Sequence, residues 1–378
     1  MKTGMSRRNW MKTTAGGITA GVLCTDGSRP AGAAIASEPE IKIAGYDYDR
    51  VRGIVDGQYG LPGSRVSFDF QDIYKANEMA FGSERNYEIT EIGLIPYVTK
   101  FINEDFREYR LIPIFISRIF RHRNVFVHAD AGIEKPSDLR GKRIGTPGYG
   151  SSANTWIRGL LRDEYGVKHD EVQWIETVKS SDQGAVTGGG GFSAFEGDGS
   201  SYYLPDNFPL KQGPAGVDES ELLLSGECDA VIAPITPRAF EEGNPKILQL
   251  FQNPYEAERA YFKKTGIFPI MHAVAIRKDV IAANPALPEA VFKMYSQAKY
   301  QAYANMETTT ASKVTLPWVS QELQETRELM GTDFWRYGIE ANRKELELVM
   351  RYTFEQGLVK RQGQYEEMFE PSTLSLLE

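Results

Sequence analysis

Strand-like and helix-like segments alternate from Ile41 onward, and this alternation limits the possible folds more than any other feature. "IKIAGYDY" (41–48) is typical of a strand followed by a loop, and "FQDIYKANEMAFG" (70–82) has helical spacing. "YEITEIGLIPYVTKFI" (87–102) runs from a strand into a helix, and "RLIPIFI" (110–116) returns to a strand. This β-α-β order predicts an α/β fold, an open sheet covered by helices.

The pattern is repeated in the middle of the chain. A strand is predicted at 143–145, followed by a loop and a helix with Ser151, Ser152 or Asn154 as its N-cap and Gly166 at its end. "ELLLSGECDAVIAP" (221–234) predicts a helix, a turn and a strand, and three amphipathic helices are predicted after residue 275. The glycine-rich stretch 181–207 lacks a phosphate-binding motif and is interpreted as a surface insertion.

Composition excludes several classes of function. The 378 residues are 41% hydrophobic and 25% charged, with a formal net charge of -8, as in a soluble globular protein. An acidic chain is a poor partner for nucleic acid, but a local basic pocket for a small anion remains compatible with it. The two cysteines, Cys24 and Cys228, form no zinc-site spacing with the four histidines, so no metal site is expected. Cys228 is interpreted as a small buried apolar residue.

Residues 1–36 differ from the remainder of the chain. Arg7 and Arg8 precede a weakly apolar stretch that is too short to span a bilayer, and Ala34 and Ala36 supply a small-x-small site. This pattern predicts a twin-arginine signal peptide, cleavage after Ala36 and a periplasmic protein without stable membrane insertion. The alternative is a basic tail without a targeting role on a cytoplasmic protein.

A run of positive charge interrupts an apolar segment at 112–127, "IPIFISRIFRHRNVFV". Arg118, Arg121, His122 and Arg123 are flanked on both sides by Ile, Phe and Val. A solvated loop is not normally flanked in this way, and a buried strand does not normally carry uncompensated guanidinium groups. The run therefore either binds a small anionic ligand or is a charged segment that faces water.

Several motifs carry a resemblance to known families. "DLRGKRIGTPGYGSSANTWIRGLL" (138–161) resembles the second lobe of type 2 periplasmic-binding-protein folds. "GYDYDR" (45–50), "IPIFISRIFRH" (112–122), "RAYFKKTGIFPIMHAVAIRKDV" (259–280) and "ELMGTDFWRYGIEANRKELELVMRYTFEQGL" (328–358), in this order, resemble the 4,5-dihydroxyphthalate decarboxylase family. The resemblance extends from Ile41 to the C-terminus.

The resemblance implies a two-lobed α/β fold of the type 2 periplasmic-binding-protein kind. Residues 37–125 and 266–378 would form lobe 1, residues 126–265 would form lobe 2, and two crossovers would connect them. It also implies a cofactor-independent decarboxylase that converts 4,5-dihydroxyphthalate to 3,4-dihydroxybenzoate and carbon dioxide. The leader and the glycine-rich stretch 181–207 favour an alternative, an exported solute-binding protein that delivers an aromatic carboxylate to the permease of an ABC-type transporter. Both interpretations are compatible with a homo-oligomer.

The implied reaction requires an arginine that holds one carboxylate and groups that move protons at the ring. His122 is the first choice for proton transfer because imidazole titrates near neutral pH, with Asp47 or Asp49 to orient it or to accept the phenol proton. His272 lies at the second crossover, either in the site or as a core histidine, and Glu91 either lines the cleft or caps the next helix. The predicted substrate-binding residues are Arg50, Glu91, Arg118, Arg121, Tyr149, Ser151, Ser152 and His272. These assignments predict that Arg118→Ala weakens ligand binding with little change in stability and that His122→Asn removes turnover.

Overall fold

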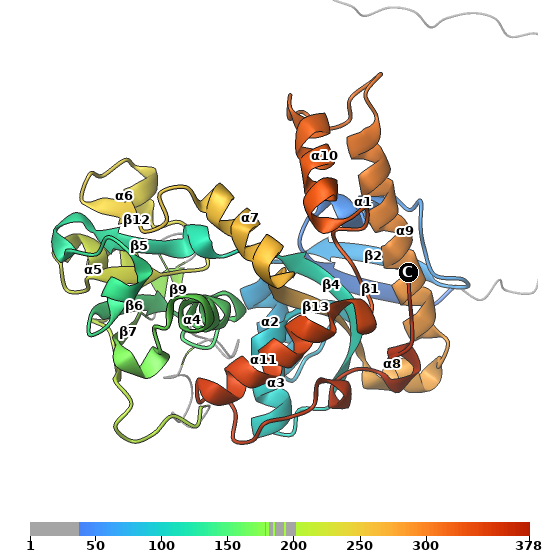
Figure 1. Ribbon diagram of the computed structural model, residues 1–378. Helices are drawn as coiled ribbons and strands as arrows, with labels where there is room; N and C mark the ends of the chain where they lie inside the picture. Colours follow the sequence, from blue (N-terminus) through green and yellow to red (C-terminus); the bar gives the residue numbers. More distant parts are fainter. Residues whose placement is uncertain (1–37, 178, 181–183, 186–192, 194–201) are drawn as a thin grey trace, which may run out of the picture. The chain divides into compact units, whose positions relative to one another are not determined.

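The computed structural model describes residues 38–177, 179–180, 184–185, 193 and 202–378 (Figure 1). The predicted signal peptide, residues 1–36, lies outside the described residues, as does most of the glycine-rich stretch 181–207. The remainder forms two mixed sheets with helices packed against them.

The first sheet has the strand order β2-β1-β3-β13-β4. Its strands are β1 (Glu40–Gly45), β2 (Arg65–Phe70), β3 (Ile89–Gly93), β4 (Tyr109–Arg118) and β13 (Ile270–Arg277). β1 runs parallel to β2 and β3, whereas β13 enters the sheet late in the chain and pairs antiparallel with β3 and β4. β3 is buried along its whole length, as expected for a central strand covered on both faces.

Most of the helices around this sheet come from the two ends of the described chain. They are α1 (Arg52–Val55), α2 (Ile73–Phe81), α3 (Leu94–Asn103), α8 (Lys278–Ala283), α9 (Leu287–Glu307), α10 (Val319–Met330) and α11 (Arg343–Glu355). The Asp72 side chain caps α2 by accepting a hydrogen bond from the Lys75 backbone N–H. Figure 1 shows α9 and α10 side by side as an antiparallel pair.

The second sheet has the order β10-β7-β6-β11-β5-β12. Its strands are β5 (Val125–His128), β6 (Arg143–Pro147), β7 (Gln173–Thr177), β10 (Leu210–Gln212), β11 (Ala230–Ile232) and β12 (Ile247–Gln249). The helices are α4 (Ser152–Tyr165), α5 (Glu219–Ser225), α6 (Arg238–Glu241) and α7 (Pro254–Thr265), and a separate two-strand ladder joins β8 (Lys179–Ser180) to β9 (Gly184–Ala185). Ser151 caps α4, and Gly166 ends it in the left-handed region at φ 68°, as predicted.

The chain passes between the two sheets twice, from β4 to β5 through 119–124 and from α7 to β13 through 266–269. The prediction of an α/β fold with two sheet-centred lobes and two crossovers is therefore confirmed. One hydrophobic cluster includes residues of both sheets, and the indole N–H of Trp156 in α4 donates to the Ile270 carbonyl of β13 at 2.9 Å. Trp156 is thus a core residue.

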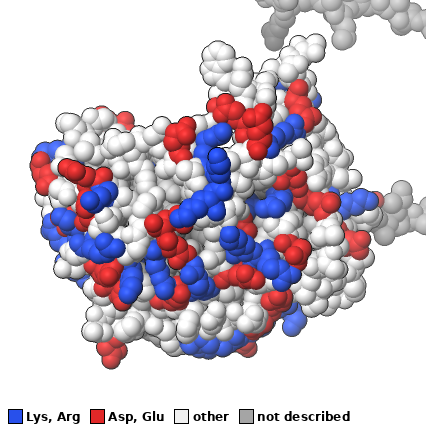
Figure 2. All heavy atoms as spheres, in the orientation of Figure 1, with Lys and Arg blue, Asp and Glu red and all other residues white. Residues whose placement is uncertain are grey.

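The distribution of surface charge and the burial of Cys228 agree with the expectations from composition. Figure 2 shows acidic and basic side chains interspersed on the face in view, with no continuous basic stripe on it. Among the described residues, no helix has both the length and the apolar character needed to cross a membrane. Cys228 is fully buried and unpaired, and burial raises the pKa of its thiol to about 12.

Candidate functional site

A histidine and a carboxylate from neighbouring strands form a close pair in the first sheet. His272 on β13 pairs with Gly93 on β3, and Val274 pairs with Glu91, so His272 and Glu91 are diagonal neighbours on one face. The Nδ1 atom of His272 lies 2.6 Å from Glu91 Oε1. The Glu91 side chain is 4% exposed, whereas that of His272 retains 15% of its exposure.

The loop after β1 completes the surroundings of the Glu91 carboxylate. The Tyr48 hydroxyl donates to Oε1 at 2.8 Å, and the Tyr46 backbone N–H donates to Oε2 at 3.0 Å. The Tyr46 ring stacks on the His272 imidazole, with ring centroids 6.2 Å apart. Gly45 leaves the space that the carboxylate occupies, because a Cβ at this position would lie 3.0 Å from Glu91 Oε2.

These contacts determine what the pair can do chemically. An ionised carboxylate only accepts hydrogen bonds, so Glu91 holds the proton of His272 on Nδ1 and leaves Nε2 as the reactive nitrogen. Nε2 has no hydrogen-bond partner among the described residues. Burial and the adjacent Glu91 raise the pKa of Tyr48, which therefore remains a hydrogen-bond donor. The arrangement suits general acid–base catalysis by His272.

Arg50 adjoins this pair through Tyr48. Its guanidinium carbon lies 3.9 Å from the centroid of the Tyr48 ring and 4.1 Å from that of Trp335. Nε donates to the Ile116 carbonyl at 2.8 Å, and Nη1 lies 3.2 Å from the exposed carboxylate of Asp49. Arg50 is therefore a partly buried cation whose Nη2 has no hydrogen-bond partner among the described residues, and its contact with a substrate carboxylate stays a prediction.

Asp47 and Asp49 occupy the alternate positions of "GYDYDR" and face solvent. Asp47 forms an ion pair with Arg52, and Asp49 accepts a hydrogen bond from the Arg50 backbone N–H at 2.7 Å. Their side chains are 44% and 62% exposed. The predicted contact of either carboxylate with His122 is not found, because each is engaged locally in the loop and neither reaches that imidazole. Their catalytic role therefore has no support in the geometry.

Arg118 is the end of β4, and internal partners saturate its guanidinium. It forms an ion pair with Glu345 at 2.8 Å and donates to Asn342 Oδ1 at 2.6 Å and to the Phe268 carbonyl at 2.6 and 3.1 Å. Both charged side chains are at most 2% exposed. The expectation that Arg118→Ala spares stability is therefore wrong on physical grounds, since the change would leave the Glu345 charge buried and unpaired. A ligand contact by Arg118 stays a prediction without a free donor to support it.

His122 and Arg121 lie in the first crossover. His122 is 1% exposed, neither ring nitrogen has a hydrogen-bond partner, and the edges of Phe251 and Tyr261 pack against the ring. Burial, with a smaller contribution from Arg123, lowers the pKa of His122 to about 4. A buried, neutral imidazole with no partner on either nitrogen is poorly placed to exchange a proton with a ligand, so the geometry does not favour the predicted proton transfer by His122.

Arg121 differs from Arg118 in having no carboxylate within ion-pair distance among the described residues. It donates to the Pro234 carbonyl at 3.0 Å and to Asn124 Oδ1 at 3.3 Å, and burial lowers the pKa of its guanidinium to about 10. It remains a predicted ligand contact.

The predicted ligand-binding residues that lie near the second sheet form contacts within the fold. Ser151 caps α4 through the Asn154 backbone N–H at 3.2 Å, and Ser152 Oγ accepts from the Ile95 backbone N–H of α3 at 3.2 Å. The Tyr149 ring lies under the Arg158 guanidinium at 3.8 Å, and its hydroxyl is buried without a hydrogen-bond partner. Their contacts with a ligand stay predictions.

The sequence interpretation missed Tyr46, Tyr48 and Trp335. "GYDYDR" was identified as a motif, but its carboxylates were selected and its tyrosines were not. Residues 46–50 alternate between half-buried and exposed, so the half-buried set is Tyr46, Tyr48 and Arg50. An alternating aromatic pattern after a buried strand was the available signal.

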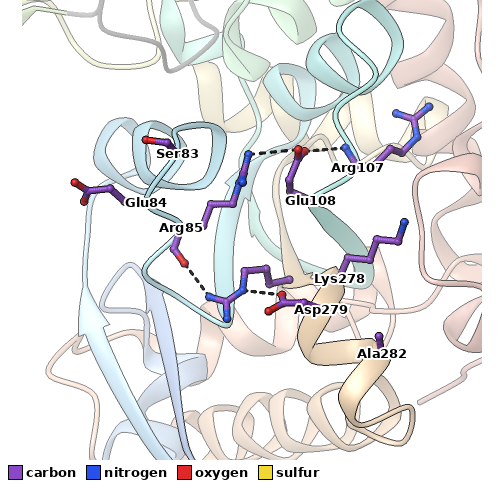
Figure 3. A pocket seen from close by; sticks show the side chains of 9 residues that line it. Ser83, Glu84, Arg85, Arg107, Glu108, Lys278, Asp279 and Ala282 are labelled. Atoms are coloured by element: carbon purple, nitrogen blue, oxygen red, sulfur yellow. Dashed lines mark hydrogen bonds and ion pairs between the residues drawn. The ribbon is translucent and has the colours of Figure 1, made fainter.

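A surface hollow of about 760 Å³ lies at the opposite end of β13 (Figure 3). Arg277 and Lys278 line it together with Arg85, Arg107 and several acids. Arg85 forms an ion pair with Glu108, which Figure 3 shows, and Arg277 forms one with Asp279. Two of its arginines are therefore already paired with acids of the same hollow. No group of three or more His, Cys, Asp or Glu residues in the described part of the chain is arranged to hold a metal ion.

Comparison with known proteins places these residues in a family. A family model described as NMT1/THI5 like matches residues 116–197. Among solved structures, the periplasmic aliphatic sulphonate binding protein SsuA from Escherichia coli is 11% identical, with a TM-score of 0.49, and the match covers 90% of this chain and 100% of that one. The desulfurization enzyme DSZB is 13% identical, with a TM-score of 0.45 and coverage of 89% and 97%.

Two curated relatives share one name. A 4,5-dihydroxyphthalate decarboxylase from Comamonas testosteroni is 36% identical over 338 residues, which cover 89% of this chain and 98% of that protein. A 4,5-dihydroxyphthalate decarboxylase from Pseudomonas putida is 32% identical over 229 residues, which cover 61% of this chain and 83% of that protein. The chain therefore belongs to the 4,5-dihydroxyphthalate decarboxylase family.

Proposed function

We propose that this protein is a carboxy-lyase that converts 4,5-dihydroxyphthalate to 3,4-dihydroxybenzoate and carbon dioxide. Family membership supports the reaction class, and the Glu91–His272 pair, with its 2.6 Å contact, is the observation that carries the mechanism. The adjacent cation Arg50 suits a substrate with two carboxylates.

In the proposed reaction, Arg50 holds the carboxylate that the substrate retains. The phenol para to the other carboxylate releases its proton to solvent, and the resulting phenolate pushes an electron pair toward the ring carbon that bears this carboxylate. The His272 imidazolium delivers its Nε2 proton to that carbon, the C–C bond breaks, and its electron pair returns to the ring as carbon dioxide leaves. Glu91 stabilises the imidazolium and fixes its orientation. This route needs no cofactor as an electron sink.

The test measures carbon dioxide release and 3,4-dihydroxybenzoate formation from purified protein. His272→Asn should lower kcat by about two to four orders of magnitude with substrate binding retained. His128→Asn, which changes a histidine on β5 of the second sheet, is the matched control and should behave like the wild type. Binding of 4,5-dihydroxyphthalate without product between pH 5 and 9 would exclude the enzyme function, and full turnover by His272→Asn would exclude the assigned residue.

The alternative function, an exported solute-binding protein, is not favoured, because both curated relatives carry the name of an enzyme. The same assay separates the two, since a binding protein closes on its ligand and forms no product.

We further propose that residues 1–36 direct export of the protein to the periplasm by the twin-arginine route. Arg7, Arg8 and the small residues at Ala34 and Ala36 support this proposal. The match to the Comamonas relative covers nearly all of that protein but only 89% of this chain, which leaves room for an additional segment here. Replacing both arginines by lysine should leave an uncleaved protein in the cytoplasm. Periplasmic accumulation of this double variant would contradict the proposal.

A further inference from the structure

The segment "GTDFWRYGIEANR" (331–343) is part of the family resemblance, yet the proposed mechanism does not use it. Trp335, a residue of this segment, contacts the guanidinium group of Arg50, as Tyr48 does. The guanidinium carbon lies 4.1 Å from the Trp335 ring centroid and 3.9 Å from that of Tyr48. The cation therefore lies against two aromatic rings.

The Trp335 ring is itself fixed from two directions. Its indole N–H donates to the Phe115 carbonyl of β4 at 2.9 Å. Phe268, in the second crossover, packs against it at nearly a right angle, with ring centroids 5.3 Å apart. The ring is therefore attached both to the first sheet and to a crossover.

The backbone of Trp335 is held by a buried lysine on α9. Lys299 Nζ lies 2.8 Å from Asp333 Oδ1, 2.6 Å from Glu378 Oε2 and 3.2 Å from the Trp335 carbonyl. The Tyr303 hydroxyl accepts a hydrogen bond from the Trp335 backbone N–H at 2.8 Å. Lys299 is fully buried, so this anchor is part of the folded core.

One nitrogen of the Arg50 guanidinium remains available to a ligand. Nε and Nη1 have partners, whereas Nη2 has no hydrogen-bond partner among the described residues. Because two aromatic rings contact the guanidinium group, its position is restricted, and Nη2 is the donor that remains for a ligand. A carboxylate oxygen that accepts a hydrogen bond from Nη2 suits this arrangement.

We propose that Trp335 is a specificity-determining residue. Together with Tyr48, it fixes the position in which Arg50 binds the carboxylate that the substrate retains. This inference rests on the proposed function and extends it to substrate selection. The product keeps the same carboxylate, so 3,4-dihydroxybenzoate should compete with the substrate, and catechol, which lacks a carboxylate, should not.

The experiment uses phthalate as the probe, because it carries both carboxylates but no phenol and so cannot be turned over by the phenolate route. Its Kd is measured by isothermal titration calorimetry for each full-length variant. Trp335→Leu should raise this Kd, and KM in the turnover assay, by about 5- to 30-fold, with kcat changed less than about 3-fold. Trp335→Phe, which keeps an aromatic face, should restore part of the affinity.

Two further variants separate the contact between Trp335 and Arg50 from general effects of a substitution on folding or binding. Trp318→Leu makes the same change at a tryptophan that is 66% exposed and should bind phthalate like the wild type. Tyr48→Phe keeps the ring on Arg50 but removes the hydroxyl that donates to Glu91, so it should lower kcat and leave the phthalate Kd unchanged. Trp335→Leu is thus expected to change mainly KM, and Tyr48→Phe is expected to change mainly kcat. A merely structural role for Trp335 does not predict this difference.

If Trp335→Leu does not fold, Trp335→Gln takes its place, since it keeps an N–H toward the Phe115 carbonyl and removes the ring. An unchanged phthalate Kd in the folded variant, or no binding of phthalate by the wild type at about 10 mM, would overturn the inference. If Trp335→Leu weakens phthalate binding but neither the wild type nor any variant releases carbon dioxide, the role of Trp335 in carboxylate binding is supported and the proposed decarboxylation fails.

Discussion

His272 and His122 both lie near crossovers between the two sheets, yet their surroundings are opposite. His272 has a carboxylate on one ring nitrogen, an aromatic ring stacked on its face and partial exposure. His122 has aromatic edges around it, no hydrogen-bond partner on either nitrogen and 1% exposure.

The difference indicates which of the two histidines is the better candidate for proton transfer. Proximity to arginines in the sequence favoured His122, but nearby positive charge and burial both oppose protonation. A carboxylate partner stabilises the imidazolium and selects the tautomer. The two histidines can therefore be separated by the partner of each ring, and the following experiments test that separation.

The largest effect is expected at the carboxylate that orients His272. Glu91→Gln keeps the size of the side chain but removes the charge that stabilises the imidazolium, so kcat should fall by about 100- to 1,000-fold. His122→Asn should retain kcat within about 3-fold, contrary to the expectation from sequence. Steady-state kinetics of the two variants give the comparison directly, and a large loss of kcat in His122→Asn would reverse the two assignments.

The next effect concerns the buried ion pair of Arg118 and Glu345. Arg118→Met leaves the Glu345 carboxylate buried without a cation and should lower the free energy of unfolding by about 3 to 5 kcal/mol. The double variant with Glu345→Met should recover most of this loss. Urea unfolding measures both, with Lys75→Met in the exposed Lys75–Glu78 pair as the control expected to change stability by less than about 1 kcal/mol. A stable Arg118→Met protein would show that the pair is not needed.

The pH dependence of stability isolates His122. The pKa of about 4 in the folded protein is below the ordinary value of 6.5, so the unfolded chain binds the proton more readily. Stability should therefore fall as the pH decreases from 6.5 toward 4, by about 2 kcal/mol at pH 5 from this residue. His122→Phe should remove that part of the loss.

The measurement for His122 is the difference in urea unfolding between pH 7.5 and pH 5, wild type against variant. Burial also lowers the pKa of His169 to about 4, so a similar contribution should persist in His122→Phe. An identical pH dependence in the wild type and the variant would contradict the buried neutral state of His122.

The smallest effect is expected at Gly45. A Cβ there would lie 3.0 Å from Glu91 Oε2, so Gly45→Ala should shift the carboxylate by a few tenths of an ångström and lower kcat by about 10-fold or less. Gly60→Ala, at a position where a Cβ meets nothing within 4 Å, is the control. Equal activity of the two variants would show that the position of Glu91 tolerates displacement.

The sequence was sufficient for the fold because the information is local. The period of apolar residues placed β3, α3 and β4, and a serine and a glycine marked the ends of α4. The two crossovers were predicted from the family resemblance. They are confirmed because the chain leaves the first sheet after β4 and returns to it at β13.

The site was only partly predictable because its contacts join distant segments. Glu91 and His272 were both selected, but their pairing depends on the register of β3 and β13, which are separated by 176 residues between Gly93 and Ile270. Arg118 was selected as a substrate contact, whereas its internal partners Asn342 and Glu345 lie more than 220 residues away in the sequence. No local pattern distinguishes a cation that awaits a ligand from one already neutralised.

The buried thiol of Cys228 has a practical consequence for studying this protein in solution. Cys24 lies within the predicted signal peptide, so the processed chain would contain a single cysteine. Burial raises the pKa of its thiol to about 12, and a protonated, inaccessible thiol reacts slowly with maleimide or iodoacetamide reagents. A cysteine introduced at an exposed position such as Trp318 would therefore accept a fluorophore or spin label selectively, without prior removal of the native residue.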